Sequence, residues 1–263
     1  MTSEDRGPTS ATDSEEGPRS SSARTESTSS STKKHLPLWQ ETGLLLLMAV
    51  VLAVIIKAFF MQAFYIPSES MEPGLIKNDR ILVQKVSYWF GGHPERGDVV
   101  VFKDPGGWLS PAEEVGPTNA VAKVMSKIGL YPQGGHLVKR VIGVEGDTIH
   151  CCDDQGRIEV NGQPLDEPYL KTAKGTRCNG PMIPGCDWTA GPVPKDHIFV
   201  MGDHRDRSAD SSDHMCGGAT DCTDSPYIPV DDVVGKVFVL LWPLDRFDWV
   251  GRPDTFSKVP DAK

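Results

Sequence analysis

The sequence predicts a mostly β protein, with one N-terminal transmembrane helix followed by an extracytoplasmic domain built on an antiparallel, barrel-like β-sheet. An uncharged apolar run, residues 43–56, lies near the start of the 263-residue chain. Beyond it, short runs of β-branched and aromatic residues alternate with Gly and Pro clusters, which is typical of strands and turns. The six cysteines include no C-x-x-C pair, so they favour disulfides in an oxidising compartment over a zinc ribbon.

The first 35 residues predict a disordered tail. They are mostly Ser, Thr, Glu, Arg, Gly and Pro, and they contain no Phe, Tyr or Trp. Such a segment buries too little apolar surface to offset the entropy lost on ordering. Its acidic residues argue against a transit peptide.

Residues 36–62 predict a transmembrane anchor. The run 43–56 alone is shorter than the roughly 20 residues that cross a bilayer, but counting from residue 36, with Lys57 reaching toward the interface, makes the span adequate. A cleavable signal peptide fits less well. Such a peptide needs small side chains at positions −3 and −1 of the cleavage site, and residues 60–63 have no small side chain at position −3 relative to Ala63. A buried core helix is the other alternative, although it suits the preceding tail poorly.

Orientation and domain boundaries follow from the anchor. Lys33 and Lys34 precede the span, so the positive-inside rule places the tail in the cytoplasm and the remainder outside a cell membrane. We therefore expect a single-pass protein in contact with membrane lipid. Its folded extracytoplasmic domain covers residues 63–252, followed by a flexible C-terminal tail, 253–263.

Seven runs within this domain predict strands, and one segment predicts a helix. Asn161–Gly162 separates two of the runs and is a strong two-residue hairpin signal. Apolar spacing over residues 119–128 predicts an amphipathic helix. The predicted strands cover residues 80–83, 98–102, 137–144, 158–160, 163–165, 197–201 and 233–242.

The cysteine pairing remains open at the level of sequence. Cys178 with Cys186, and Cys216 with Cys222, would each close a short loop. The adjacent Cys151 and Cys152 have no obvious local partner. Buried free thiols are the alternative interpretation.

The segment 66–75 is the first that carries candidate chemistry. Pro67 and Pro73 favour an extended backbone, in which side chains two residues apart face the same side. Ser68 and Ser70 would then point together, as a nucleophile and an oxyanion donor. An ordinary Pro-rich loop is the simpler alternative for this segment alone.

Lys139 is the candidate general base. It lies within an apolar strand run, where a charge is costly unless it is paired or lost. Desolvation would lower the pKa of a lysine and free its lone pair, whereas the pKa of an arginine is too high for this, which leaves Arg140 as a structural cation. A lysine on an edge strand that reaches solvent is the alternative.

The run 201–212 concentrates charges and hydroxyl groups after a predicted strand. It is either a solvated acidic loop or the support for an active site. Together with segments 66–75, 136–147 and 96–102, in this order and after an N-terminal anchor, it resembles bacterial type I signal peptidases over roughly residues 38–250.

The resemblance implies a membrane serine endopeptidase that removes signal peptides from exported preproteins, cutting after small residues and using no cofactor. It also implies roles for individual residues. Ser70 is the nucleophile, Lys139 the general base, and Ser68 helps the Ser70 amide form the oxyanion hole. Ser208 orients the lysine. Gly202 and Asp203 lie in a turn near the site, and Asp210 is a supporting acid.

Two positions depart from the family pattern. His204 stands where the family commonly has Asn, and Ser212 stands where it commonly has Arg. We therefore expect Asp210 to pair with another cation, Arg205 or Arg140. The role of the long stretch 106–135 is open.

Other functions fit the sequence less well. With a net charge of −9 and no basic stripe, the chain is not expected to bind nucleic acid. No G-x-S-x-G elbow supports a Ser-His-Asp hydrolase, and a repressor-like Ser-Lys protease would need a DNA-binding module. An anchored metal-binding or adhesion module is the alternative from another class, although its residue spacing matches no standard metal site. Its residues would be Asp203, His204, Asp206, Asp213, His214 and Cys216.

Overall fold

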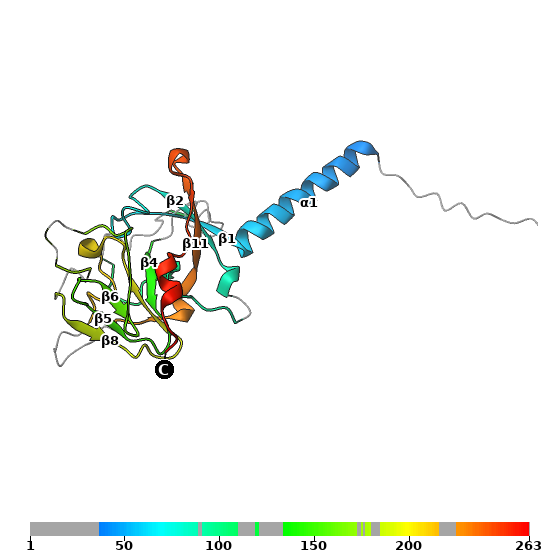
Figure 1. The fold of residues 1–263 in the computed structure, drawn as a ribbon. Helices are drawn as coiled ribbons and strands as arrows, with labels where there is room; N and C mark the ends of the chain where they lie inside the picture. The colour runs from blue at the N-terminus through cyan, green and yellow to red at the C-terminus, as the bar shows by residue number, and fades with distance from the viewer. Residues whose placement is uncertain are drawn as a thin grey trace, which may run out of the picture. The chain divides into compact units, whose positions relative to one another are not determined.

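A computed structural model describes residues 37–88, 91–109, 119–120, 134–172, 175, 177–179, 185–215 and 225–262. Contacts divide the chain into two units, Met1–Leu45 and Leu46–Lys263. Helix α1 (Leu38–Phe59) contains most of the predicted anchor (Figure 1). No helix formed by the described residues has both the length and the apolar character needed to cross a membrane.

The larger sheet has eight strands and is antiparallel throughout. Its order is β1-β2-β11-β3-β4-β9-β10, and β12 also pairs with β11. This confirms a mostly β, antiparallel fold. Among the described residues the pairing does not close into a barrel, and β1 and β10 end the sheet. The strands are β1 (Met61–Tyr65), β2 (Arg80–Gln84), β3 (Val99–Lys103), β4 (His136–Gly143), β9 (His197–Met201), β10 (Ile228–Pro229), β11 (Val233–Trp242) and β12 (Asp248–Trp249).

A second, four-stranded sheet follows β4 in the sequence, in the order β7-β6-β5-β8 (Figure 1). Its strands are β5 (Ile149–Cys151), β6 (Ile158–Val160), β7 (Gln163–Pro164) and β8 (Trp188–Ala190). The predicted hairpin is confirmed: Asn161 and Gly162 join β6 to β7 with φ of 53° and 77°, as a two-residue turn of this kind requires. Short 3₁₀ helices complete the fold at Val86–Tyr88, Arg205–Arg207, Val230–Asp232, Leu244–Arg246 and Asp254–Lys258.

Strand β4 lies inside the larger sheet, because β3 pairs with one of its edges and β9 with the other. Apolar side chains of β4 and its neighbours fill the cores on both faces, among them Val100, Val141 and Ile142. Lys139 is therefore not on an edge strand, and its side chain is buried and does not extend into solvent. The same position leaves the neighbouring Arg140 buried as well.

The C-terminal segment and the start of the domain differ from the sequence prediction. Residues 253–263 are predicted as a flexible tail, but Phe256 and Val259 are buried in the core beside Ile142. A Cβ on Gly97 would overlap the Phe256 ring, so the C-terminal segment packs directly against the backbone at Gly97. Strand β1 begins at Met61, inside the predicted anchor. The predicted helix at 119–128 lies almost wholly outside the described residues.

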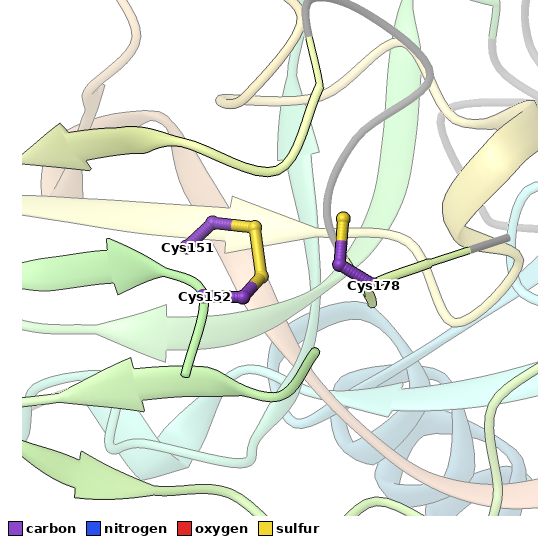
Figure 2. A group of neighbouring side chains, drawn as sticks. All are labelled: Cys151, Cys152 and Cys178. Atoms are coloured by element: carbon purple, nitrogen blue, oxygen red, sulfur yellow. A yellow bond between two sulfur atoms is a disulfide. The ribbon is translucent and has the colours of Figure 1, made fainter. Parts of the chain in front are cut away.

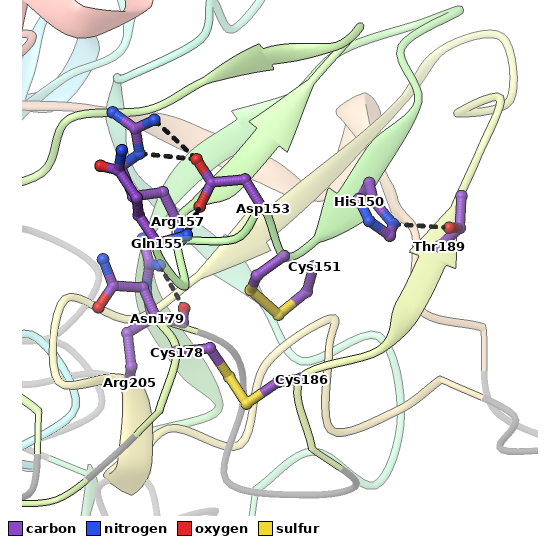
Figure 3. The surroundings of a disulfide bond; sticks show 11 residues. His150, Cys151, Asp153, Gln155, Arg157, Cys178, Asn179, Cys186, Thr189 and Arg205 are labelled. Carbon is purple, nitrogen blue, oxygen red and sulfur yellow. Dashed lines mark hydrogen bonds and ion pairs between the residues drawn. A yellow bond between two sulfur atoms is a disulfide. The ribbon is translucent and has the colours of Figure 1, made fainter.

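Two disulfides lie among the described residues, one at the end of β5 and one within the loop between β7 and β8. Cys178 pairs with Cys186, one of the two pairings that the sequence suggests (Figure 3). Cys151 and Cys152 pair with each other, which corrects the expectation that they lack a local partner. Cys216 and Cys222 lie outside the described residues.

Candidate active site

Ser70 and Lys139 lie next to each other in the structure, although they are 69 positions apart in sequence. Lys139 projects from β4, and Ser70 lies in the loop between β1 and β2. The Lys139 Nζ atom is 2.7 Å from Ser70 Oγ, and both residues are buried, at 4% and 6% exposure. Burial removes water that would otherwise stabilise the charged amine. The structure thus brings together the two residues that the sequence singles out as nucleophile and base.

The loop 66–75 forms successive turns rather than the extended segment that the sequence predicts. The Glu72 amide donates to the Glu69 carbonyl at 3.1 Å, and the Leu75 amide donates to the Met71 carbonyl at 3.0 Å. Ser68 Oγ nevertheless lies 3.3 Å from Ser70 Oγ. The two hydroxyls converge as expected, but a turn brings them together instead of strand alternation.

Gly202 allows the run after β9 to approach Ser70 closely. A Cβ at this position would overlap the Ser208 side chain and the Ser70 carbonyl oxygen. Ser208 is fully buried and donates to Asp210 Oδ2 at 2.5 Å, while the Gly202 amide donates to the same oxygen at 2.9 Å. Since a serine hydroxyl has one proton, Ser208 can then only accept a hydrogen bond from another group.

Asp210 does not form the ion pair that we expect from the sequence. Its Oδ1 accepts from the Ser212 amide at 3.0 Å and from the Ser212 hydroxyl at 2.5 Å. Arg140 and Arg205, the expected partners, bind other carboxylates. Either a cation or several hydrogen bonds can stabilise a buried carboxylate. Here the two hydrogen bonds from Ser212 do so in place of a cation.

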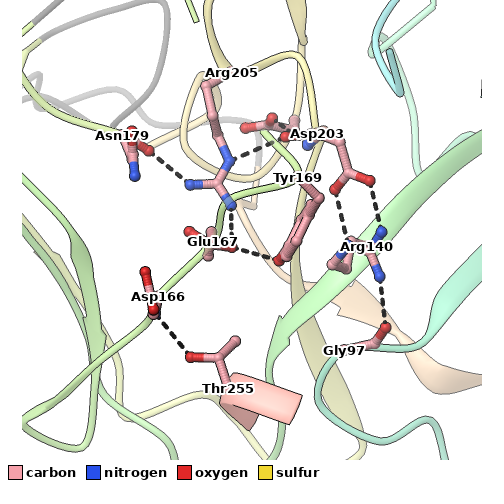
Figure 4. A network of polar contacts seen from close by, with 11 residues as sticks. Gly97, Arg140, Asp166, Glu167, Tyr169, Asn179, Asp203, Arg205 and Thr255 are labelled. Atoms are coloured by element: carbon pink, nitrogen blue, oxygen red, sulfur yellow. Dashed lines mark hydrogen bonds and ion pairs between the residues drawn. The ribbon is translucent and has the colours of Figure 1, made fainter. Parts of the chain in front are cut away.

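Arg140 instead forms a bidentate pair with Asp203 (Figure 4). Its Nε donates to Asp203 Oδ1 at 2.8 Å and its Nη2 to Oδ2 at 2.6 Å, while Nη1 donates to the Gly97 carbonyl. Burial opposes the charge of Arg140, but the Asp203 carboxylate outweighs this effect and raises the pKa of the guanidinium. The pair ties β4 to the turn at Gly202.

A second buried pair, which the sequence analysis misses, continues this network (Figure 4). Arg205 and Tyr169 each donate to Glu167 Oε1 at 2.7 Å, and the Arg140 guanidinium lies over the Tyr169 ring. Burial and the Glu167 charge raise the pKa of Tyr169, so its phenol stays protonated as a donor. Arg205 also donates to the Gly202 carbonyl. No sequence pattern signals this contact, because residues 167–169 and 205 meet only through the fold.

Arg205 also connects this network to the disulfide loop. Its Nη1 donates to the Asn179 carbonyl at 2.7 Å, next to the Cys178–Cys186 bond (Figure 3). The amide of Asn179 in turn donates to the Gly156 carbonyl. The loop closed by the disulfide therefore supports the turn that lies behind Ser70.

His204 contacts the nucleophile loop twice. Its amide donates to the Ser70 carbonyl at 3.0 Å, and its Nδ1 lies 3.1 Å from the Glu69 carbonyl. Its Nε2 is 3.7 Å from Asp206 Oδ1, a buried oxygen without a hydrogen-bond partner among the described residues. The sequence marks His204 only as a departure from the family pattern.

Two residues of the metal-binding alternative are engaged in other contacts, and Cys216 lies outside the described residues. Asp203 is paired with Arg140, and His204 contacts Glu69. Among the described residues, one group of ligand-type side chains gathers closely, with the sulfurs of Cys151, Cys152 and Cys178 within 4.8 Å of one another (Figure 2). All three sulfurs belong to disulfides, so they are not available as thiolate ligands.

The arrangement is suited to nucleophilic catalysis. A serine hydroxyl within hydrogen-bond distance of a buried lysine amine can be activated when that amine is uncharged. Among the residues that the structure describes, none accepts a hydrogen bond from the Ser70 amide, which leaves this donor available to a ligand. The Ser70 hydroxyl, the Lys139 amine and the Ser70 backbone N–H therefore lie at one place.

Comparison with known proteins identifies the family of the chain. Residues 39–242 match the family described as signal peptidase, peptidase S26. Signal peptidase I from Mycobacterium tuberculosis H37Rv is 41% identical over 79% of this chain and 74% of its own length. The probable signal peptidase I of Mycobacterium leprae is 38% identical over 83% of this chain and 81% of its own length.

A more distant relative and one solved structure extend the comparison. Signal peptidase I from Leptolyngbya laminosa is 34% identical over 80% of this chain and 82% of its own length. A crystal structure of a signal peptidase I from Enterococcus faecalis matches 54% of this chain and 95% of its own, with 21% identity and a TM-score of 0.31. The family match and the identities of the curated relatives show that the chain belongs to the signal peptidase family, peptidase S26.

Proposed function

We propose that this protein is a serine endopeptidase that removes N-terminal signal peptides from exported preproteins, with Ser70 as nucleophile and Lys139 as general base. The observation that carries the proposal is the 2.7 Å approach of the Lys139 amine to the Ser70 hydroxyl in a buried site. The family membership of the chain, and the names of its relatives, support the substrate class.

The reaction begins with proton transfer from Ser70 Oγ to uncharged Lys139, as Ser70 attacks the scissile carbonyl carbon. The negative oxygen of the tetrahedral intermediate accepts hydrogen bonds from the Ser70 amide and the Ser68 hydroxyl. Lys139 then gives its proton to the leaving amine as the peptide bond breaks. In the second half, Lys139 takes a proton from the water that attacks the acyl-enzyme carbonyl, and returns it to Ser70 Oγ as the ester bond breaks. Each oxyanion donor contributes about 3 kcal/mol in comparable sites.

Ser208 and Asp210 act on the base rather than on the substrate. Because Ser208 donates to Asp210, its oxygen can accept a hydrogen bond from Lys139 and direct the amine lone pair toward Ser70. Gly202 permits the Ser208 side chain and the Ser70 carbonyl to lie close to its own backbone. Arg140 and Asp203 hold β4 against the same turn.

The finer localisation is also part of the proposal: residues 36–62 anchor the chain in a cell membrane as a single pass, with the tail cytoplasmic and the domain outside. Support comes from the exposed apolar side chains along α1, which an aqueous setting would disfavour. The disulfides support an oxidising compartment for the domain. The exposed apolar residues include Leu44, Leu45, Leu46, Leu47, Met48, Val50, Val51, Leu52 and Val54.

The test is cleavage of a purified preprotein by the detergent-solubilised full chain, with the product masses read by mass spectrometry. We expect one cut, after small residues at positions −1 and −3 of the preprotein, and no cut when the −1 residue is replaced by a bulky one. Cleavage at unrelated bonds, or equal cleavage of both preproteins, would contradict the proposed substrate class.

A further inference from the structure

The amide of Ser70 belongs to the same peptide unit as the carbonyl of Glu69. A peptide unit is planar, and in the trans form its N–H and C=O groups point in opposite directions. The bond between Glu69 and Ser70 is not among the cis peptides of the chain. Whatever fixes the direction of the Glu69 carbonyl therefore also fixes the direction of the Ser70 N–H.

His204 is placed to do this. Its Nδ1 lies 3.1 Å from the Glu69 carbonyl oxygen, and since a carbonyl can only accept, a hydrogen bond between them requires the hydrogen on Nδ1. The His204 amide donates to the next carbonyl, that of Ser70, at 3.0 Å. One residue thus holds the peptide units on both sides of the Ser70 Cα atom, and its side chain is 6% exposed.

We propose that His204 is a positioning residue for the oxyanion hole, whose Nδ1–H orients and polarises the peptide that carries the Ser70 amide. This inference rests on the proposed function, in which that amide binds the oxyanion. The Glu72 amide also donates to the Glu69 carbonyl, from within the same turn, so His204 adds the contact from outside the loop. A hydrogen bond received at the carbonyl strengthens the N–H of the same peptide as a donor.

The proposal also accounts for the family's asparagine at this position. In both side chains the δ nitrogen is bonded to Cγ, so asparagine can present an N–H close to where His204 presents Nδ1–H. Leucine has nearly the shape of asparagine but no donor. Replacing His204 by each of these residues therefore separates the hydrogen bond from the packing.

The experiment compares kcat and KM for preprotein cleavage by wild type, His204→Asn and His204→Leu. We expect kcat to fall about ten-fold or more in His204→Leu, with KM changed less than two-fold, because an oxyanion donor acts on the transition state and not on substrate binding. His204→Asn should recover most of the loss. Equal kcat values in the two variants, whether both high or both low, would overturn the proposal.

His197 offers a matched control. Its Nδ1 also contacts a backbone carbonyl, that of Lys195 at 2.7 Å, but at the start of β9 and away from Ser70. His197→Leu and His197→Asn should have equal kcat values. Thermal unfolding of all variants checks that each one folds.

A second readout does not require cleavage and so separates this inference from the proposed function. In the full chain with isotope-labelled histidines, of which there are seven, nitrogen chemical shifts report which ring nitrogen of His204 is protonated. We expect hydrogen on Nδ1, assigned by comparison with His204→Asn. A neutral His204 ring with hydrogen on Nε2 alone would overturn the role of His204, even if the wild type cleaves the preprotein. A wild type that carries hydrogen on Nδ1 but does not cleave the preprotein would instead reject the proposed peptidase function.

Discussion

At the scale of single residues, the site depends on the direction of a few hydrogen bonds. Ser208 donates its single proton to Asp210, and the carboxylate is held by amide and hydroxyl groups instead of a cation. This leaves the Ser208 oxygen as an acceptor beside the turn that meets Ser70. Asp210 is thus supported without a cation at Ser212.

Removal of this acceptor gives the first prediction. Ser208→Ala should lower kcat for preprotein cleavage by roughly ten- to a hundred-fold, which corresponds to about 1 to 3 kcal/mol, because the amine of Lys139 loses one orienting contact. KM should change little, since the substrate is not contacted. Ser257→Ala, at an exposed serine, is the control. A Ser208→Ala enzyme with wild-type kcat would show that Lys139 is oriented by another group.

The protonation state of Lys139 gives a second prediction. Only the uncharged amine can take the Ser70 proton, so kcat/KM on the acidic side should rise with pH as Lys139 loses its proton. Lys139→Arg, which keeps a charge at every accessible pH, should be inactive throughout the profile. Activity that decreases with pH over this range would mean that the base is not a lysine.

At the scale of elements, the Arg140–Asp203 pair joins a central strand to the turn at Gly202. Arg140→Met should lower the free energy of unfolding by about 3 to 5 kcal/mol, because Asp203 is left as a buried, unpaired charge. Arg140→Met combined with Asp203→Leu should recover part of that loss. Both are measured by denaturant unfolding.

The control for this prediction is an exposed ion pair. Arg207→Ala removes a contact with Glu69 in which both side chains are largely exposed, so the free energy of unfolding should stay close to the wild-type value. Equal losses for Arg140→Met and Arg207→Ala would contradict the role given to the buried pair.

The elements also show what the sequence can and cannot predict. Long strands such as β4 and β11 carry enough apolar pattern to be found, and Asn161–Gly162 determines its own turn. Strands β5 and β8 have three residues each, too few for a pattern, and they are missed. The Glu167–Arg205 pair is missed because neither local spacing nor composition indicates which distant charges will meet.

The loop around Ser70 shows a prediction that is right for the wrong reason. Pro67 and Pro73 suggest an extended segment, and alternation in it would bring Ser68 and Ser70 to one side. In the structure, turns bring the two hydroxyls to 3.3 Å instead. Proline restricts its own φ and the residue before it, but it does not decide between an extended segment and a series of turns.

At the scale of the whole molecule, the proposed anchor precedes a domain that contains both sheets. Strand β1 begins at Met61 and pairs with β2, so a chain lacking residues 1–59 retains every strand of both sheets. We expect alkaline carbonate to extract this shortened chain from membranes, whereas the full chain stays in the membrane pellet. Extraction of both chains alike would contradict the single-pass anchor.

The central claim is that Ser70 and Lys139 together cleave the preprotein. The most direct measurement is the cleavage rate of one preprotein by wild type, Ser70→Ala and Lys139→Ala, with Lys103→Ala, at an exposed lysine of β3, as the control. The 2.7 Å contact between the Lys139 amine and the Ser70 hydroxyl predicts that both site variants lose cleavage while they unfold at wild-type temperatures, and that Lys103→Ala remains active. Substantial cleavage by either site variant would contradict the Ser-Lys mechanism.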